Sequence, residues 1–481
     1  MASQAAQLPP MIFADDFIER MNIAWRIEPG QLDPHNPLLE PKYPWDSASP
    51  AIGHGTVLKD PLDGLFKYWG CSVAEDLQYV RGHHQFRLTY AYSEDGVNWV
   101  RPELDICSFE GYPRTNIIFD FDSGGRATYA SVFIDPEENP DEPYEMFVFR
   151  DMYQCAADRV AGFDEPPDPT RGNALYRYRS TDGLHWRAAE GPLYLDTADT
   201  LYIHKCPEGG YVAHHKIGVP SLPGGYVPYD VGAGECRIGM RKTSPDGSQW
   251  SESVPLMMPD WQDHPGDQIM EVGYYPYDNG IIGVTAIYHA ITQTLDLQFA
   301  ASVDGRNWWR PAPRRACLPL APLGDYGGGM IWPTRTLVED GDKLYLYYGA
   351  LDGLHGDIYA KTDNCYLFHG AFCRAGWDKG RMWGAVPAAG GQTEAQLTTS
   401  VQPCTGTLYV NAVTVADGEI TAELLDERRA PIPGFTRRES VPFRGDAKLA
   451  PLEWVGGTKL PERASVRFYL RKARLYGFAW R

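Results

Sequence analysis

Short apolar runs separated by turn residues recur along most of the chain. Runs of roughly four to eight residues rich in Val, Ile, Tyr and Phe end repeatedly at Gly, Pro, Asn or Asp. Hardly any segment keeps the apolar spacing of an amphipathic helix over several turns. The pattern therefore predicts an all-β protein made of many short strands.

Five stretches of the chain predict a β-hairpin with its own turn. The paired strands are expected at Gly53–Leu58 with Leu65–Trp69, Ala127–Ile134 with Tyr144–Arg150, Thr200–Cys206 with Tyr211–Lys216, Ile269–Tyr277 with Ile281–His289, and Ile331–Val338 with Lys343–Tyr348. Dipeptides such as Asp63-Gly64 and Asn279-Gly280 favour the tight turns. Five such hairpins predict the five blades of a β-propeller.

A second repeat, S-x-D-G-x-x-W, occurs four times. The copies are Ser93–Trp99, Ser180–Trp186, Ser244–Trp250 and Ser302–Trp308. Asp-Gly supplies a tight turn between two outer strands, and the Trp is expected to pack on the sheet. Matches at a long, uneven spacing are typical of propeller blades whose loops vary in length. The fifth unit lacks the motif; its outer strand is expected near Cys365–Cys373, with the N-terminal segment helping to close the ring.

The sequence pattern changes at about Trp383. Beyond it, neither the hairpin pattern nor the S-x-D-G-x-x-W motif occurs again. Alternating segments predict strands at Ala395–Val401, Leu408–Val415, Ile420–Leu425, Ala464–Leu470 and Ala473–Ala479. We therefore predict an N-terminal strap (1–50), a five-bladed propeller that holds the active site (51–382) and a β-sandwich (383–481), with Pro387–Gly391 as the linker. The sandwich is expected to be structural and to pack on the propeller or on another subunit. Packing on another subunit would make the protein a homo-oligomer.

Composition excludes several classes of partner. The chain has 44 Lys and Arg against 63 Asp and Glu, a formal net charge of -19, so its field repels nucleic acid and anionic lipid. It is 43% hydrophobic but has no apolar run long enough to span a bilayer. We expect a soluble globular protein that binds neither nucleic acid nor membrane.

Cysteine usage and the first residues bear on location. The nine cysteines are spread singly, with no CxxC pair or zinc-type spacing, which indicates reduced, buried thiols. The segment Met1–Pro10 lacks the basic start and apolar core of a secretion signal. We expect a cytoplasmic protein, or a secreted one if a signal has been removed.

Several segments together resemble a known family. Phe13–Glu19, Asn36–Asp46, the repeated turns, Pro431–Phe435 and Leu475–Phe478 are similar to those of bacterial glycosyl hydrolase family 32-like proteins, over nearly the whole chain. The resemblance implies a five-bladed propeller of the family 32, 43, 68 and 130 type, a C-terminal β-sandwich and a carbohydrate substrate. Met21–Trp25 and Gly234–Arg237 match only fragments of the family 32 catalytic motifs, and Glu235 begins an outer strand, so we reject it as the acid/base.

Propeller geometry selects the candidate site. Each first strand runs along the central pore and each second strand returns antiparallel, so one face collects the starts of first strands and the ends of second strands. These positions are rich in acids, His, Arg and Trp. We expect substrate contacts from His54, Trp69, Arg150, Asp151, His214, His215, Lys216, Asp267, His289, Trp332 and His355.

Glycosidic cleavage needs two carboxyl groups, and their separation decides between retention and inversion. Our candidates are Glu271, Asp199 and Asp46. Glu271 lies in an apolar strand, where a carboxylate costs several kcal/mol unless it faces a polar pore. The alternatives are that Asp199 caps a turn and that Asp46 pins the strap.

Other chemistry stays open at this point. The run from His214 to Lys216 could bind an anionic group, and a bound phosphate that reacts would make the enzyme a phosphorylase; the alternative is a solvated loop edge. Trp69, Trp332 and Tyr288 could stack on sugar rings or simply pack in the core. No cofactor or metal is expected; the alternative is a pore Ca²⁺ held through water by His54 and His355.

The leading hypothesis is a glycoside hydrolase that cleaves an oligosaccharide with paired carboxylates in the pore. The second hypothesis is a carbohydrate-binding propeller without catalysis. A lectin needs aromatic rings and hydrogen-bonding groups but no acid/base pair, so convergence of two acids in the pore separates the two.

Overall fold

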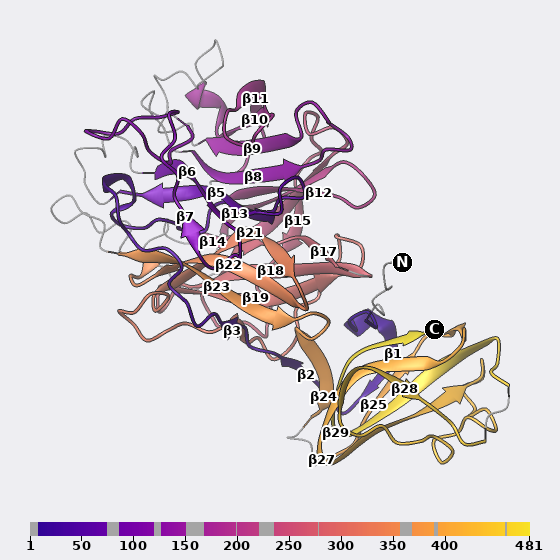
Figure 1. The fold of residues 1–481 in the computed structure, drawn as a ribbon. Helices are drawn as coiled ribbons and strands as arrows, with labels where there is room; N and C mark the ends of the chain where they lie inside the picture. Colours follow the sequence, from indigo (N-terminus) through magenta and orange to yellow (C-terminus); the bar gives the residue numbers. More distant parts are fainter. Residues whose placement is uncertain are drawn as a thin grey trace.

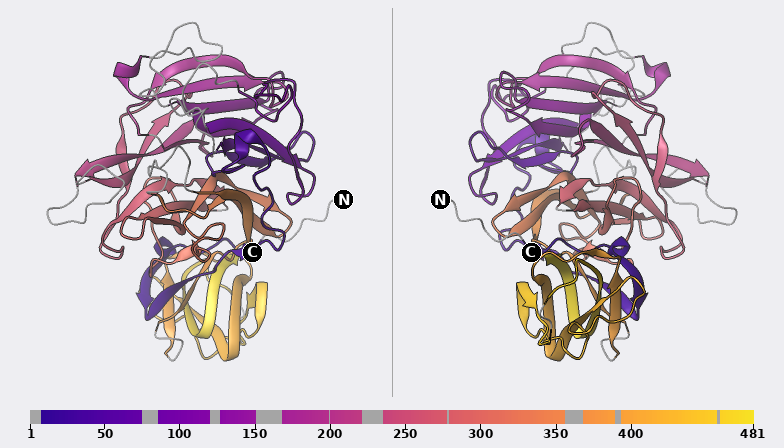
Figure 2. Two further views of the ribbon diagram at one scale, coloured as in Figure 1. Left: turned by 90° about the vertical axis from the view of Figure 1, so that its left-hand side faces the viewer. Right: turned by 90° about the vertical axis from the view of Figure 1, so that its right-hand side faces the viewer.

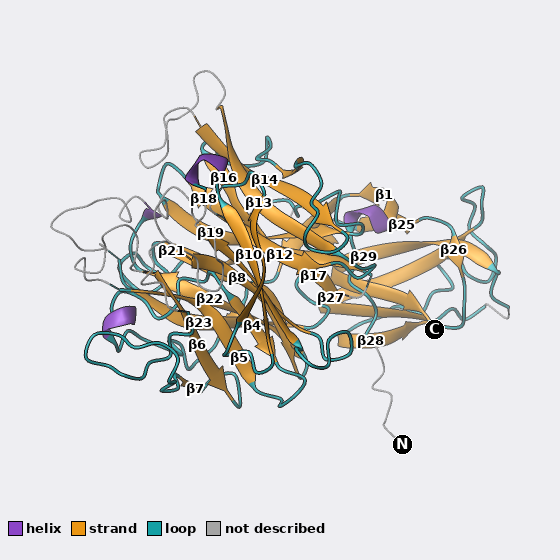
Figure 3. Ribbon diagram, turned by 90° about the horizontal axis from the view of Figure 1, so that it is seen from above, coloured by secondary structure: helices purple, strands orange, loops and turns teal. Residues whose placement is uncertain are grey.

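The protein is all-β (Figure 1). The computed structural model describes residues 8–74, 86–119, 127–150, 168–198, 200–220, 235–277, 279–355, 368–388, 393–456 and 459–481. Short 3-10 turns lie at Ala14–Asp16, Pro44–Asp46 and Pro169–Arg171. Figure 3 shows how strands dominate the molecule. No helix in the described ranges is long and apolar enough to cross a membrane.

Five antiparallel units make up most of the described chain. Unit 1 contains β4 (Thr56–Lys59), β5 (Phe66–Val73), β6 (Phe86–Ser93) and β7 (Trp99–Val100). Unit 2 contains β8 (Ala127–Ile134), β9 (Tyr144–Arg150), β10 (Ala174–Ser180) and β11 (Arg187–Tyr194). Unit 3 contains β12 (Leu201–Lys205), β13 (Tyr211–Pro220), β14 (Glu235–Ser244) and β15 (Val254–Met257).

Units 4 and 5 are joined by one parallel bridge between β19 and β21. Unit 4 contains β16 (Asp267–Val272), β17 (Tyr275–Tyr277), β18 (Gly280–His289), β19 (Thr294–Ser302) and β20 (Ala316–Leu318). Unit 5 contains β21 (Met330–Asp340), β22 (Lys343–Leu351), β23 (Gly370–Asp378) and β3 (Gln31–Leu32). Because β3 pairs with β23, the N-terminal segment supplies the last strand of unit 5.

Contacts between neighbouring units close a ring. Strand β4 lies against β8, β8 against β12, β13 and β14 against β16, β18 and β19 against β21, and β21 returns to β4. The first strands of the units therefore face a common centre. We call this arrangement the five-unit ring.

All four S-x-D-G-x-x-W copies form the predicted turn. In the first, Ser93 Oγ accepts a hydrogen bond from Gly96 N at 2.9 Å, and Asp95 Oδ1 accepts one from Val97 N at 2.8 Å. Gly96 has φ +73°, and its counterparts Gly183, Gly247 and Gly305 have φ +75°, +83° and +66°. Only Gly adopts this backbone without strain, which explains the motif's glycine.

The remaining strands form a C-terminal assembly that also includes the start of the chain. It contains β1 (Phe17–Met21), β2 (Ile23–Ile27), β24 (Trp383–Pro387), β25 (Ala395–Thr399), β26 (Gln402–Pro403), β27 (Leu408–Leu425), β28 (Asp446–Leu452) and β29 (Arg463–Trp480). Figure 2 shows it as a separate lobe beneath the ring. Strand β1 pairs with β25 and β2 with β24, so part of the predicted strap belongs to this assembly.

The sequence divided two long strands too finely. Strands β27 and β29 each run through a region predicted as two strands. Asp417 at φ +60° and Lys472 at φ +49° bend the chain while hydrogen bonding continues on both sides. In the sequence, a local bend of this kind has the same pattern as a turn between two separate strands. Strand β28 was not predicted at all, because the sequence from Asp446 to Leu452 has no β-branched residue.

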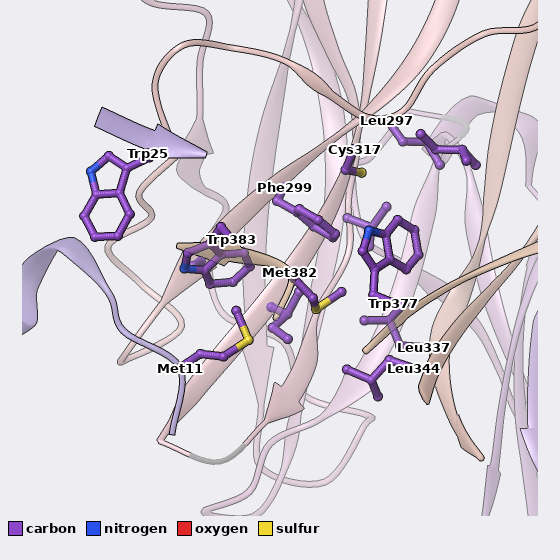
Figure 4. Close-up of a cluster of buried hydrophobic side chains, with 14 of the residues drawn as sticks. Met11, Trp25, Leu297, Phe299, Cys317, Leu337, Leu344, Trp377, Met382 and Trp383 are labelled. Atoms are coloured by element: carbon purple, nitrogen blue, oxygen red, sulfur yellow. The ribbon is translucent and has the colours of Figure 1, made fainter. Parts of the chain in front are cut away.

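A large apolar cluster joins the C-terminal assembly to the ring (Figure 4). Trp383 lies 6.0 Å from Phe13 and 5.6 Å from Phe299, measured between ring centroids, and its Nε1 donates to Ile12 O at 2.8 Å. Phe299 also contacts Trp377 at 5.3 Å. One continuous core therefore packs the C-terminal assembly against units 4 and 5. The seven described cysteines are thiols that form no disulfide bond.

Candidate functional site

Each of the five units contributes a side chain to one buried group at the centre of the ring. We call the group the central cluster: His54 just before β4, Tyr129 of β8, Thr200 just before β12, Glu271 of β16 and Trp332 of β21. All five residues are at most 5% exposed. Three of them, His54, Glu271 and Trp332, are sequence candidates that the structure brings together.

Hydrogen bonds and ring contacts hold the central cluster together. Tyr129 OH lies 3.0 Å from His54 Nε2 and 3.2 Å from Thr200 Oγ1. The His54 ring stacks on Tyr129 at 4.1 Å and meets Trp332 edge-on at 5.0 Å. His54 Nε2 is also 3.9 Å from Glu271 Oε1. One imidazole nitrogen is thus placed between a phenol and a carboxylate.

A β-bulge re-aims Glu271. Ile269 pairs with Ile287 and Glu271 with Ala286, so β16 carries one extra residue at this point. In a regular strand Glu271 would share the face of Ile269, which lies in an apolar cluster with Val272. Bulges recur next to active sites because they redirect a side chain in this way.

Tyr129 also sits at an irregular backbone position. The register of β8 shifts between Thr128 and Ser131, and Tyr129 has φ +57°. A bulky residue in this region costs of order 1 kcal/mol or more and persists only where the surroundings hold it. Two of the five inner strands therefore deviate from regular geometry at the residue that enters the central cluster.

The cluster continues along one side through aromatic contacts. His355 lies 6.3 Å from Trp332 and 4.7 Å from Tyr288, again between ring centroids. The Arg237 guanidinium lies 5.4 Å from the Tyr288 ring, and its Nη1 donates to Gln268 Oε1 at 3.1 Å. His355, which the sequence predicts to contact the substrate, therefore lies beside the central cluster.

Tyr202 of β12 lies close enough to Glu271 for the charge of that carboxylate to affect its hydroxyl. Burial, and after it the charge of Glu271, raise the pKa of the Tyr202 hydroxyl well above its ordinary value. Tyr202 OH donates to Pro333 O at 3.5 Å. This phenol therefore stays protonated and borders the central cluster from unit 3.

Asp267 and His289 form a separate ionic group at the same end of unit 4. His289 Nδ1 donates to Asp267 Oδ1 at 2.7 Å, and Nε2 lies 3.1 Å from Asp296 Oδ2. Both ring nitrogens are engaged by carboxylates. The group clamps β16, β18 and β19 together just before the bulge that carries Glu271.

We expect His289 to remain an imidazolium well above neutral pH. Burial alone lowers the pKa of His289, but the two carboxylates raise it to about 10. Its contribution to stability is therefore full below the unfolded-state pKa of about 6.5 and is lost as the pH rises through about 10. Nitrogen-15 NMR at pH 8 should show both ring protons in place. Loss of a proton near pH 6.5 would contradict the clamp.

His214 and His215 project from opposite faces of β13, as the sequence predicted. His214 Nδ1 lies 2.9 Å from Val272 O in unit 4, whereas His215 Nε2 lies 2.7 Å from Ser253 Oγ. Burial lowers the pKa of both imidazoles to about 4. Both are neutral at pH 7, so neither supplies positive charge for phosphate. Lys216, next along the strand, is also buried.

Two further candidates, Trp69 and Asp46, lie apart from the central cluster in the described contacts. Trp69 is fully buried, and its Nε1 donates to Gly183 O at 2.7 Å, so it offers no open face to a sugar ring. Asp46 forms an ion pair with Arg101 and accepts hydrogen bonds from Lys42 N and Tyr43 N. These partners make it a tether of the strap.

The other predicted residues are placed as follows. Arg150 is buried at the end of β9. Asp199 and Asp151 lie outside the described residues. Asp199 directly precedes Thr200, which belongs to the central cluster. Within the described ranges, no three His, Cys, Asp or Glu side chains are arranged to hold a metal ion.

Sequence reasoning missed Tyr129, Tyr202 and Arg335. Arg335 interrupts the inner strand β21 with a buried charge, the same signal that identified Glu271, so it could have been found. Tyr129 and Tyr202 gave no such signal, because a Tyr in a strand usually packs in the core.

Comparison with known proteins gives distant likenesses only. No known family model matches the chain, and no curated protein matches it. Among solved structures it is similar to one described as a glycoside hydrolase, with 11% identity over 73% of this chain and 92% of that chain and a TM-score of 0.44. A second is described with the statement that the GH130 family of mannoside phosphorylases contains glycoside hydrolases that target β-1,2 mannosidic linkages in Candida mannan. It shows 14% identity over 77% of this chain and 97% of that chain, with a TM-score of 0.44. A third is a β-1,2-mannobiose phosphorylase from Listeria innocua (14%, 75% and 98%, 0.42). Likenesses this remote assign no activity to the chain.

Proposed function

We propose that the protein is a glycoside-processing enzyme that cleaves a glycosidic bond of an oligosaccharide in the centre of a five-bladed propeller, without a cofactor. The observation that carries the proposal is the convergence of all five units on Glu271, with bulges that redirect both Glu271 and Tyr129. The resemblance to propeller glycosidases supplies the substrate class. The C-terminal assembly, a β-sandwich in this proposal, serves as a support.

Glu271 and Asp199 form the proposed pair of carboxyl groups. One protonates the leaving oxygen, and the other acts as nucleophile or activates the attacking group. His54 and Tyr129 lie beside Glu271, with His54 Nε2 3.9 Å from Glu271 Oε1 and 3.0 Å from Tyr129 OH. Trp332 offers an aromatic edge to the sugar. Asp46 is assigned to the strap because Arg101 and two backbone amides occupy it.

Phosphorolysis is the second candidate, in which phosphate rather than water receives the sugar. Arg237 favours it: this residue is 9% exposed, and its guanidinium lies against Tyr288, beside His355. A guanidinium presents several N–H donors in a planar fork that suits phosphate oxygens. His214 and His215, uncharged at pH 7, offer phosphate hydrogen bonds but no positive charge.

A substrate screen tests the proposal. The full chain is incubated with a panel of aryl glycosides and natural oligosaccharides, with and without inorganic phosphate. We expect release of a reducing sugar in water, or a sugar 1-phosphate that forms only when phosphate is present. Binding to a saccharide without either product would instead identify a carbohydrate-binding protein.

A further inference from the structure

A polar cleft lies between units 3 and 4, away from the central cluster. Its volume is about 260 Å³, near the lower end of the range of roughly 300–1,000 Å³ that is usual for small-molecule sites. Cys206, which follows β12, and Tyr274, which follows β16, both line it, so the cleft lies where the first strands of these two units end. Its described lining contains no residue of the central cluster. We call it the unit 3–4 cleft.

Arg241 of β14 places a guanidinium in this cleft. It stands directly opposite His214 of β13, which contacts Val272 O of unit 4, so Arg241 lies on the face of unit 3 that meets unit 4. Burial raises the pKa of the nearby Cys206 thiol, and the positive charge of Arg241 acts against this rise. Among the described residues, no carboxylate pairs with Arg241, and its buried Nε meets no hydrogen-bond acceptor.

Further buried nitrogen atoms without a hydrogen-bond partner gather beside Arg241. In the described part of the chain they are both ring nitrogens of His204, Nε2 of His214 and Nε1 of Trp308. The His214 ring lies 5.4 Å from His204 and 5.8 Å from Trp308, measured between ring centroids. Tyr274 of the cleft lies 5.5 Å from each of the two His rings. Because buried polar atoms nearly always bond to protein, water or ligand, their concentration here marks an interface that binds polar molecules.

The rim of the cleft carries charges of both signs. Arg306 adds a second guanidinium, and Glu208 and Asp304 add carboxylates; all three residues are exposed. Asp304 is occupied by its own turn, where Oδ1 accepts hydrogen bonds from Arg306 N and Asn307 N and Oδ2 accepts one from Asn307 Nδ2, each at 2.8 Å. The rim carboxylate that can accept hydrogen bonds from a ligand is therefore that of Glu208. An anionic group fits beside Arg241, whereas hydroxyl groups fit beside Glu208.

We propose that the unit 3–4 cleft binds a small hydroxylated anion, a monosaccharide that carries one phosphate or carboxylate group. The planar fork of Arg241 suits the oxygen atoms of either group, and such an oxygen supplies the acceptor for Nε. The hydroxyl groups of the sugar donate to Glu208, and Arg306 contributes a second positive charge at the rim. The site is separate from the ring centre and does not depend on the proposed function.

Titration calorimetry on the full chain tests the inference. The probes are glucose 6-phosphate and glucuronate, with glucose as the uncharged comparison. We expect one of the two anions to bind at one site per chain, at least about tenfold more tightly than glucose. Arg241→Met should weaken this binding by at least about tenfold, because hydrogen bonds from a charged donor are lost. The melting temperature of the unliganded variant should stay the same or rise, since Met removes a buried nitrogen that has no partner.

Arg237→Met is the matched control. Arg237 belongs to the same strand, β14, but its guanidinium lies against Tyr288, beside the central cluster. This variant should keep the affinity for the anion. Binding that survives Arg241→Met, or that is lost in Arg237→Met instead, overturns the inference. The same holds if neither anion binds more tightly than glucose, or if unliganded Arg241→Met loses stability, which would make Arg241 a structural residue. Inorganic phosphate that binds as tightly as glucose 6-phosphate would overturn the recognition of a sugar.

Discussion

Replacing Glu271 with Gln is expected to lower turnover at least about 100-fold, the scale of a lost acid/base group. The amide keeps the size of the carboxyl and its place in the bulge, so the melting temperature should change little. Asp199→Asn is expected to behave in the same way. Steady-state kinetics on the saccharide found in the screen, together with thermal melts, measure both effects.

A matched control comes from the C-terminal assembly. Glu423 of β27 is also a buried carboxylate, but it bonds to Tyr469 OH at 2.6 Å and to Arg467 at 3.2 Å, away from the ring centre. Glu423→Gln should leave turnover unchanged while it lowers stability. Full activity of Glu271→Gln would show that Glu271 has no catalytic role, whereas unfolding of this variant would favour a structural role for the residue.

Replacing Arg335 with Met is expected to lower the free energy of unfolding by about 3 kcal/mol. Hydrogen bonds from charged donors contribute roughly 1.5–3 kcal/mol each, and Met removes three that cross between units. Part of this is offset because burial disfavours the charge and lowers the pKa of Arg335 to about 9. Urea denaturation followed by tryptophan fluorescence measures the change.

An exposed cation provides the comparison. Lys59 pairs with Asp340 at 2.8 Å, with side chains 44% and 37% exposed. Lys59→Met removes a charge from unit 1 at the surface and should change stability by no more than about 0.5 kcal/mol. If Arg335→Met is as stable as Lys59→Met, Arg335 does not hold the units together.

Local signals account for the parts of the fold that the sequence predicted. The strands Ala127–Ile134 and Tyr144–Arg150 coincide with β8 and β9, because apolar runs end there at an acidic, Pro-containing turn. The S-x-D-G-x-x-W turns depend on contacts within seven residues and were equally legible. The strand pairs of β1 and β2 join residues several hundred positions apart, which no local pattern encodes.

The same difference between local signals and properties of the folded chain decides which residues of the candidate site could be predicted. Glu271 was found because a charge in an apolar strand needs a polar environment. Trp69 was misplaced because alternation does not show which face of β5 meets unit 2. Tyr129 was missed because its entry into the site depends on a positive φ and a register shift. These are properties of the folded backbone that leave no mark on the hydrophobic pattern.

Strands β1 and β2 pair with β25 and β24, which are synthesised much later, so these strand pairs form late in folding. Phe17 of β1 finds its partner Thr399, and Ile23 of β2 its partner Pro387, only after the whole ring has left the ribosome. Unit 5 likewise waits for β23 before β3 can join it. Ring closure and the final lobe are therefore late, non-local steps, which are slow and leave apolar strands exposed in the meantime. Chaperones that shield strand edges should therefore raise the yield of folded protein.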